Sequence, residues 1–307
     1  MDAYYIANQG DRPDLAEMEV NPPEGYIGNK VLPVSVSAEK AGTIAYATLT
    51  ADAAAQTSRT AGTAPSSVQI SNSATTFSCL QYEKRGSITP DEVKQMGGIA
   101  KAEVVGSKYA KRQVMKAYES AVCAEILGLT VVATFDPAKI LTQIQTADAT
   151  IRQYEGKTAL VGSTMTIKKM VLAMLSDRTM GPVFARLISG TNNATAAAGL
   201  SLQSWVNGLA TFLGIDQVLV GDDAVWNDGS YAGRFAVARL DDGTDELSHK
   251  WKPVFGKTFQ FLPDGVNPWQ ITAVADRVAK NNHLDAELWM DTLVLNSGAA
   301  YLFDGVV

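Results

Sequence analysis

The sequence predicts an α+β fold built around one long helix over residues 99–127. Two other patterns support this class. The stretch before the helix alternates apolar and polar residues as strands do, and the C-terminal part alternates in the same way over two long segments. Between the helix and those segments, short apolar runs alternate with helical spacing, which is typical of a compact α/β unit.

The long helix is expected to have a marked start and a one-sided apolar face. Thr89, Pro90 and Glu92 match a capping box with proline at the first helical position, and Gly97-Gly98 then interrupts the helix. Beyond these glycines one face is apolar, with Met115, Tyr118, Val122 and Ile126 flanked by Val114, Ala117 and Ala121. The opposite, solvent-facing side is expected to hold Lys111, Arg112, Lys116 and Glu119.

At ~1.5 Å per residue, residues 99–127 span roughly 43 Å. A helix of this length predicts an elongated, flat molecule. Gly106 inside the helix is a candidate for a bend, and Gly128 suits the C′ position after its end.

Residues 1–30 are polar, rich in proline and glycine, and without a sustained period. They predict an extended arm that has no core of its own chain to pack on. Residues 31–88 predict a β excursion that projects away from the helix, with strand patterns at 31–37, 44–49, 68–70 and 77–82. Its tip, Ala51 to Ser67, consists of small and polar residues that cannot bury apolar surface alone.

The compact unit is expected over roughly 161–262. Before this unit, a helix should begin at Asp136-Pro137 and end at Gly156. From there on, the sequence predicts a strand at 158–161, a helix at 165–175, a loop at 176–200, a helix at 202–213 and strands at 218–220 and 235–240. Asp241-Asp242-Gly243 is interpreted as a hairpin turn.

The C-terminal segments predict a long hairpin that lies against the long helix and buries its apolar face. Its strands cover 269–275 and 284–292, with Asn281-Asn282-His283 as the turn. A last short strand, 301–303, should close the chain.

Composition narrows the function classes. The formal net charge of −6 argues against a general nucleic-acid binder. The sequence contains no run of ~18 apolar residues, so it predicts no transmembrane helix. The N-terminus lacks the pattern of a signal peptide. Cys79 and Cys123 are expected to be buried free thiols.

Several short motifs resemble catalytic ones but are incomplete. Asp222-Asp223 after a strand could hold a divalent metal, as in template-copying polymerases, although a solvated turn is favoured. The remaining motifs each lack a required partner: Gly156-Lys157-Thr158 and Gly256-Lys257-Thr258 for a phosphate loop, Gly162-Ser163-Thr164 for a nucleophile elbow, and Asn193-Ala194-Thr195 for secretory glycosylation. With two histidines, His249 and His283, far apart, the sequence predicts no catalytic, cofactor-binding or metal-binding residue.

The order of these elements is unusual, and two segments carry a family resemblance. The first runs from Val68 to Glu92 and contains Phe77-Ser78-Cys79; the second runs from Phe212 to Gly221 and is followed by Ala224-Val225-Trp226-Asn227. Both resemble the major capsid (coat) protein of tailed bacteriophages, with the Hong-Kong-97-type capsid fold. The resemblance covers nearly the whole chain in element order.

The resemblance implies an N-terminal arm at 1–30, an extended loop at 31–88, a peripheral domain at 89–160 plus 263–307 with a spine helix at 99–127, and an axial domain at 161–262. It also implies a homo-oligomer of hexamers and pentamers that forms an icosahedral virion shell, assembled in the host bacterial cytoplasm. The shell would enclose double-stranded DNA without sequence-specific binding or a membrane. Implied partners are a scaffolding protein, a portal and decoration proteins. The acidic charge fits a shell that contains DNA without gripping it.

Two alternatives remain open at this stage. An encapsulin-like bacterial nanocompartment shell resembles the same fold but packages enzymes, so particle contents discriminate between the two. A metal-dependent nucleotidyl enzyme acting through Asp222 and Asp223 is a distant alternative, which metal-dependent nucleotide incorporation would reveal.

Overall fold

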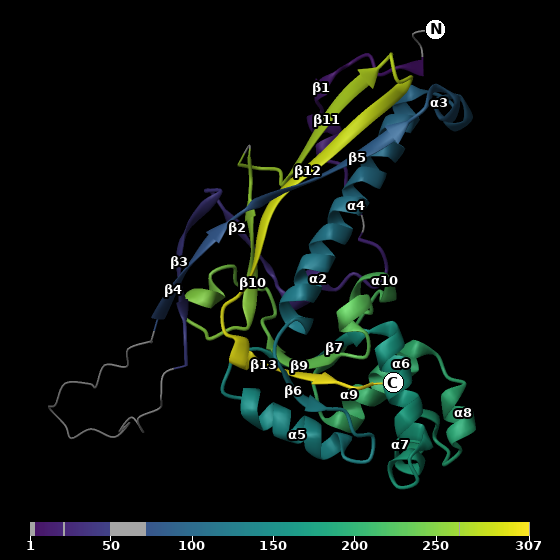
Figure 1. Ribbon diagram of the computed structural model, residues 1–307, viewed down its shortest axis with the longest axis vertical. Coiled ribbons are helices and arrows are strands. Elements are labelled where there is room, and N and C mark those ends of the chain that lie inside the picture. Colours follow the sequence, from purple (N-terminus) through teal and green to yellow (C-terminus); the bar gives the residue numbers. More distant parts are fainter. Residues whose placement is uncertain (1–3, 21, 50–71, 264, 307) are drawn as a thin grey trace, which may run out of the picture.

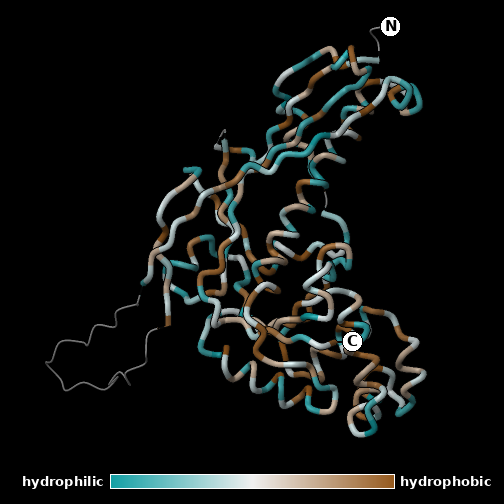
Figure 2. The backbone as a smooth tube through the Cα atoms, in the orientation of Figure 1, coloured by the Kyte–Doolittle hydropathy of each residue, from teal (hydrophilic) through white to brown (hydrophobic). Residues whose placement is uncertain are grey.

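The computed structural model describes residues 4–20, 22–49, 72–263 and 265–306. Figure 1 shows an elongated molecule, in which α4 (Ile99–Leu127) and the hairpin of β11 (Trp269–Asp276) and β12 (Asn281–Val294) run along the long axis towards a compact half. The long helix has the bounds that the sequence predicted. Figure 2 shows hydrophobic and hydrophilic residues interspersed along both halves, and within the described ranges no helix is long and apolar enough to cross a membrane.

The start of the helical region follows the predicted capping box. The Thr89 hydroxyl accepts the Glu92 N–H at 3.3 Å, and the Thr89 N–H donates to the Glu92 carboxylate at 2.7 Å. Gly97 at φ 81° and Gly98 at φ 128° then separate α3 (Pro90–Met96) from α4, because both adopt backbone conformations that favour glycine. Gly128 follows the end of α4, but with φ −83° it does not take the left-handed C′ conformation.

The long helix lies against a six-stranded sheet. The strand order is β1-β11-β12-β10-β2, and β5 also pairs with β12. The remaining strands are β1 (Gly10–Asp11), β2 (Val34–Ser37), β5 (Leu80–Ile88) and β10 (Gly256–Phe261). The alternating residues of β12, namely Leu284, Ala286, Leu288 and Met290, share one core with Val114, Tyr118, Val122 and Ile126 of α4. The predicted burial of the helix by the hairpin is therefore confirmed.

Two glycines let α4 approach β5 closely. A Cβ on Gly86 would lie 2.5 Å from the Gly106 carbonyl oxygen, and one on Gly106 would lie 2.6 Å from Ile88 and 2.7 Å from Leu284. Because α4 runs unbroken through Gly106, this glycine serves the close packing of helix on sheet.

The compact half is a five-stranded sheet with order β6-β13-β9-β7-β8. Its strands are β6 (Val131–Thr134), β7 (Lys157–Ser163), β8 (Gln217–Gly221), β9 (Phe235–Leu240) and β13 (Ala300–Asp304). Alternate residues of β9 enter two cores: Ala236 and Ala238 belong to the core of α4, whereas Phe235 and Val237 pack with the helices on the other face. Those helices are α5 (Ile140–Ile151), α6 (Thr164–Ser176), α7 (Met180–Ser189), α8 (Ala194–Ala198) and α9 (Leu202–Leu213).

Several local predictions in the compact half were wrong. The predicted loop at 176–200 contains the helices α7 and α8. The helix predicted to begin at Asp136-Pro137 begins instead at Ile140, and Asp136 accepts the Ala138 N–H in the turn before it. Asp241-Asp242-Gly243 does not close a hairpin, since β9 and β10 lie in different sheets.

Strand membership also differs from the predicted grouping of segments. Strand β10, expected in the compact unit, pairs with β12 and β2 in the long sheet. Strand β13, expected with the hairpin, pairs with β6 and β9 in the compact sheet. The hairpin turn lies at 277–280, where Lys280 has φ 55°, and Asn281-Asn282-His283 belong to β12. The Asn282 side chain is buried and ties β12 to the N-terminal segment through Tyr4 and Ile6.

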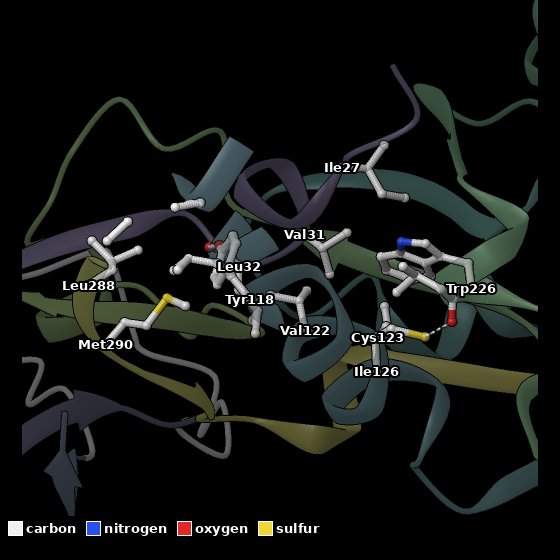
Figure 3. Packing of buried hydrophobic residues seen from close by; sticks show 14 of the residues in the cluster. Ile27, Val31, Leu32, Tyr118, Val122, Cys123, Ile126, Trp226, Leu288 and Met290 are labelled. Carbon is white, nitrogen blue, oxygen red and sulfur yellow. Dashed lines mark hydrogen bonds between the residues drawn. The ribbon is translucent and has the colours of Figure 1, made fainter. Parts of the chain in front are cut away.

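The arm packs on its own chain, which the sequence did not predict. Ile6, Leu15 and Ile27 are buried in the core of α4, and short helices form at α1 (Pro13–Ala16) and α2 (Gly28–Val31). Figure 3 shows Val31 and Leu32 next to Tyr118 and Val122 of α4. The expectation of an arm without an intramolecular packing surface was therefore wrong.

A two-stranded sheet of β3 (Ala41–Ala47) and β4 (Asn72–Ser78) projects from the molecule, as Figure 1 shows. Among the strands described, β3 and β4 pair with each other alone. The predicted tip Ala51 to Ser67 and the predicted strand at 68–70 lie outside the described residues.

Substituting Gly86→Ala should destabilise the protein by about 1–3 kcal/mol, because the new methyl group meets the backbone of α4 rather than a side chain that can move. Urea unfolding measures this. The matched control is Gly199→Ala, whose Cβ would lie 3.6 Å from its nearest neighbour; it should change stability by no more than ~0.5 kcal/mol. Equal stability of the two variants would contradict the close approach of α4 to β5.

Candidate functional site

The two aspartates that the sequence offered as a metal pair are used by the backbone. The Asp222 side chain accepts the Ala224 N–H and caps the short helix α10 (Asp223–Trp226). Asp223 accepts the Met165 N–H at 2.6 Å, at the start of α6. No group of three or more His, Cys, Asp or Glu side chains suited to a metal ion occurs in the described part of the chain. These contacts give both residues a structural role at the junction of β8, α10 and α6.

The lysines of the two phosphate-loop-like motifs are in different surroundings. Lys157 is exposed at the start of β7. Lys257 is fully buried, where its ammonium lies 2.7 Å from the Asp241 carboxylate and donates to the Asp245 carbonyl. Asp241 also accepts a hydrogen bond from the Ser248 hydroxyl at 2.7 Å. Lys257 is therefore engaged in a buried ion pair and is not presented to a ligand.

The remaining motif residues act in capping or packing. Ser163 and Asn193 cap the N-termini of α6 and α8 through their side-chain oxygens. Cys79 and Cys123 are buried free thiols, as predicted. Burial raises the pKa of Cys79 to about 11 and that of Cys123 to about 12, so both stay protonated near neutral pH.

One buried carboxylate, on Glu119 of α4, joins the arm to both halves of the protein. It accepts the N–H groups of Ile27 at 2.7 Å and Gly28 at 2.8 Å, and the indole N–H of Trp226 at 2.7 Å. Burial raises the pKa of Glu119, against the opposing effect of the three donors. The sequence placed Glu119 on the solvent face of the helix, and this was wrong because the segments around α2 and α10 cover α4 at this position.

A second charged residue predicted to face solvent, Lys111, holds the first part of the arm. Its ammonium donates to the carbonyls of Leu15 at 2.9 Å, Ala16 at 2.7 Å and Met18 at 2.9 Å. The side chain is 1% exposed, and burial lowers its pKa to about 8. Lys111 and Glu119 together attach the arm at two places along α4.

A small aromatic cluster anchors the projecting β3–β4 sheet. Phe77 of β4 stacks on Phe259 of β10 with ring centroids 5.1 Å apart, and the Cys79 thiol lies 3.4 Å from the Phe259 carbonyl oxygen. His249 packs edge-on to the same ring at 5.6 Å. The His249 side chain is buried, and within the described part of the chain neither of its ring nitrogens has a hydrogen-bond partner.

Comparison with known proteins rests on structure, since no family model and no curated protein matches the sequence. The fold is similar to a phage-related protein from Bordetella bronchiseptica RB50, with 16% identity, a TM-score of 0.67 and coverage of 97% of this chain and 98% of that one. It is also similar to the capsid of cyanophage P-SCSP1u, with 7% identity, a TM-score of 0.53 and coverage of 94% and 90%. A virus-like particle from Pyrococcus furiosus matches with 11% identity, a TM-score of 0.52 and coverage of 90% and 91%.

These similarities, together with the long helix, the projecting β3–β4 sheet and the compact half, identify an α+β capsid fold of the Hong-Kong-97 type. The resemblance to tailed-phage major capsid proteins is thereby confirmed at the level of the fold. The Bordetella phage-related protein shares this arrangement along nearly its whole length.

Replacing Glu119→Gln should lower the free energy of unfolding by about 2–3 kcal/mol. The amide keeps one acceptor oxygen, but its NH2 group faces either the Gly28 N–H or the N–H groups of Ile27 and Trp226, which leaves at least one buried donor unpaired. Urea unfolding of Glu125→Gln, on the same helix but without these contacts, serves as the control and should show little change. A wild-type midpoint for Glu119→Gln would show that the carboxylate does not hold the arm.

The variant His249→Leu should be less sensitive to acid than the wild type. Burial, and then the positive charge of Lys257, lower the pKa of His249 below its ordinary value of 6.5. The unfolded chain therefore takes up the proton first as pH falls, so the stability of the neutral buried ring is present above pH 6.5 and is lost below it. Unfolding measured at neutral pH and in mild acid should show the wild type losing stability relative to His249→Leu. A constant difference between the two proteins would contradict a buried neutral histidine.

Proposed function

We propose that this chain is the major capsid protein of a tailed bacteriophage, which self-assembles into the icosahedral head shell around double-stranded DNA. The observation that carries the proposal is the match of the capsid fold to 97% of this chain and 98% of a phage-related protein. The shell is built from hexamers and pentamers, and its subunits reside in the virion after assembly in the host cytoplasm. Scaffolding, portal and decoration proteins are its expected partners.

The projecting β3–β4 sheet supports a role in contacts between subunits. A two-stranded sheet is marginally stable alone, and most residues of β3 and β4 are exposed or half-buried in the single chain. Its unpaired edges are surfaces that another chain can cover. An element of this kind gains its packing in an assembly.

Exposed apolar residues on α7 also support contacts between subunits. Val183 and Leu187 are 59% and 46% exposed and lie one helical turn apart, on one face. Leu172 on the neighbouring α6 is 44% exposed. Apolar surface of this kind on a subunit is consistent with burial against a neighbour.

The domain division is part of the proposal. The arm is 1–30, the extended loop lies within 31–88, the peripheral domain comprises most of 89–160 and 263–307, and the axial domain comprises most of 161–262. The exceptions are β10, which pairs in the long sheet, and β6, α5, the first residues of β7 and β13, which belong to the compact half. We propose no catalytic, cofactor-binding or metal-binding residue, since the acidic and nucleophilic candidates serve capping, pairing and packing.

Purified protein should form closed shells or capsomers, seen by negative-stain electron microscopy and light scattering. Nucleic acid inside particles made during infection supports the virion, whereas a packaged protein cargo would point to the encapsulin-like compartment. A compact monomer with the 32.7 kDa mass of one chain, at all concentrations and with scaffolding protein present, would refute shell assembly.

A further inference from the structure

The solvent-facing side of α4 carries four positive charges between residues 101 and 116. They are those of Lys101, Lys108, Arg112 and Lys116. At 3.6 residues per turn these four positions fall within an arc of roughly 80° and extend over about 22 Å of helix. We propose that this surface, the α4 basic stripe, binds the phosphate backbone of nucleic acid without reading its sequence.

The cations of the stripe are available to a ligand. Lys101, Arg112 and Lys116 are exposed and Lys108 is half-buried. Within the described residues, none of the four is in an ion pair. Tyr109, 56% exposed, lies between them and adds a hydroxyl that can donate to a phosphate.

The acidic residues of the same helix are withdrawn from this face. Glu103 is 8% exposed and lies 3.1 Å from the Arg12 guanidinium of the arm. Glu119 is 1% exposed and accepts the three N–H donors described above. The arm, together with Trp226, therefore engages the carboxylates of Glu103 and Glu119 and leaves a positive face on a chain whose formal net charge is −6.

A polyphosphate fits this surface better than other partners. Duplex DNA carries about one negative charge per 1.7 Å of its axis, so the stripe can neutralise several phosphates in any register. A membrane-binding helix would need a broad apolar face beside the cations, but here the exposed large apolar side chains between the four cations are Val105 and Tyr109. The ligand chemistry is a dense row of phosphates.

The biological setting of this inference rests on the proposed function, but the binding itself does not. Four contacts give a weak interaction for one subunit, which repetition over a shell would multiply. The formal net charge of −6 suggested a shell that encloses DNA without binding it. The basic stripe would instead bind DNA through one helix, despite the negative charge of the whole chain. Binding by unassembled subunits can be measured whether or not shells form, so the two proposals fail separately.

The test is fluorescence anisotropy of a random-sequence duplex of about 30 base pairs, titrated with full-length unassembled protein over a range of salt concentrations. Four cations predict a slope of log K against log salt of roughly −3.6. The stripe variant replaces Lys101→Gln, Lys108→Gln, Arg112→Gln and Lys116→Gln. It should bind at least about 100-fold more weakly at low salt, with an unchanged circular dichroism spectrum.

The control variant removes the same charge from exposed positions on other segments: Lys84→Gln, Lys139→Gln, Lys169→Gln and Lys250→Gln. It should retain most of the wild-type affinity and slope. The proposal is overturned if the wild type does not bind at low salt, if the stripe variant binds like the wild type, or if the control loses as much affinity. Preferential binding of polyglutamate or anionic vesicles over the duplex would assign the stripe to an acidic protein or a membrane instead.

Discussion

Three N–H groups from two distant segments converge on the Glu119 carboxylate inside the protein. A buried carboxylate costs several kcal/mol unless its oxygens are hydrogen-bonded, so the native state requires the arm at Ile27 and Gly28 and the compact half at Trp226 to be in place together. This single requirement fixes the arm, α4 and α10 relative to one another. The hydrogen bonds to Glu119 restrict where the arm can lie on α4. Val31 and Leu32, which follow the arm in the chain, pack against α4 in that position.

The same principle applies at two other buried charges. Lys111 has three carbonyl acceptors on the arm, and Lys257 has a carboxylate and a carbonyl that link β10 to the segment after β9. Each joins segments that no local sequence signal connects. Apolar burial supplies most of the stability of such a protein, whereas these polar contacts allow few alternative placements of the arm and of β10.

If the chain is the shell subunit that we propose, this arrangement separates the contacts formed within one chain from the surfaces left for neighbouring subunits. The core around α4 and the two faces of the compact sheet are complete within one chain. The β3–β4 sheet and the exposed residues of α7 remain uncovered. The solvent face of α4 is uncovered as well, and its charge pattern distinguishes it from those apolar surfaces.

The sequence by itself determined the elements whose signals are local. The capping box at Thr89, the glycine break before α4, the bounds of α4 and α9 and the alternation in β12 all depend on residues a few positions apart, where spacing is informative. It also indicated the capsid fold, through the order of those elements. Only the tertiary structure decided that β10 and β13 exchange sheets, that the arm docks, and that Lys111 and Glu119 are buried. Glu119 lies 92 residues from Ile27 in the sequence. The helical pattern of α4 cannot distinguish a charged residue that a distant segment covers from one that is exposed to solvent.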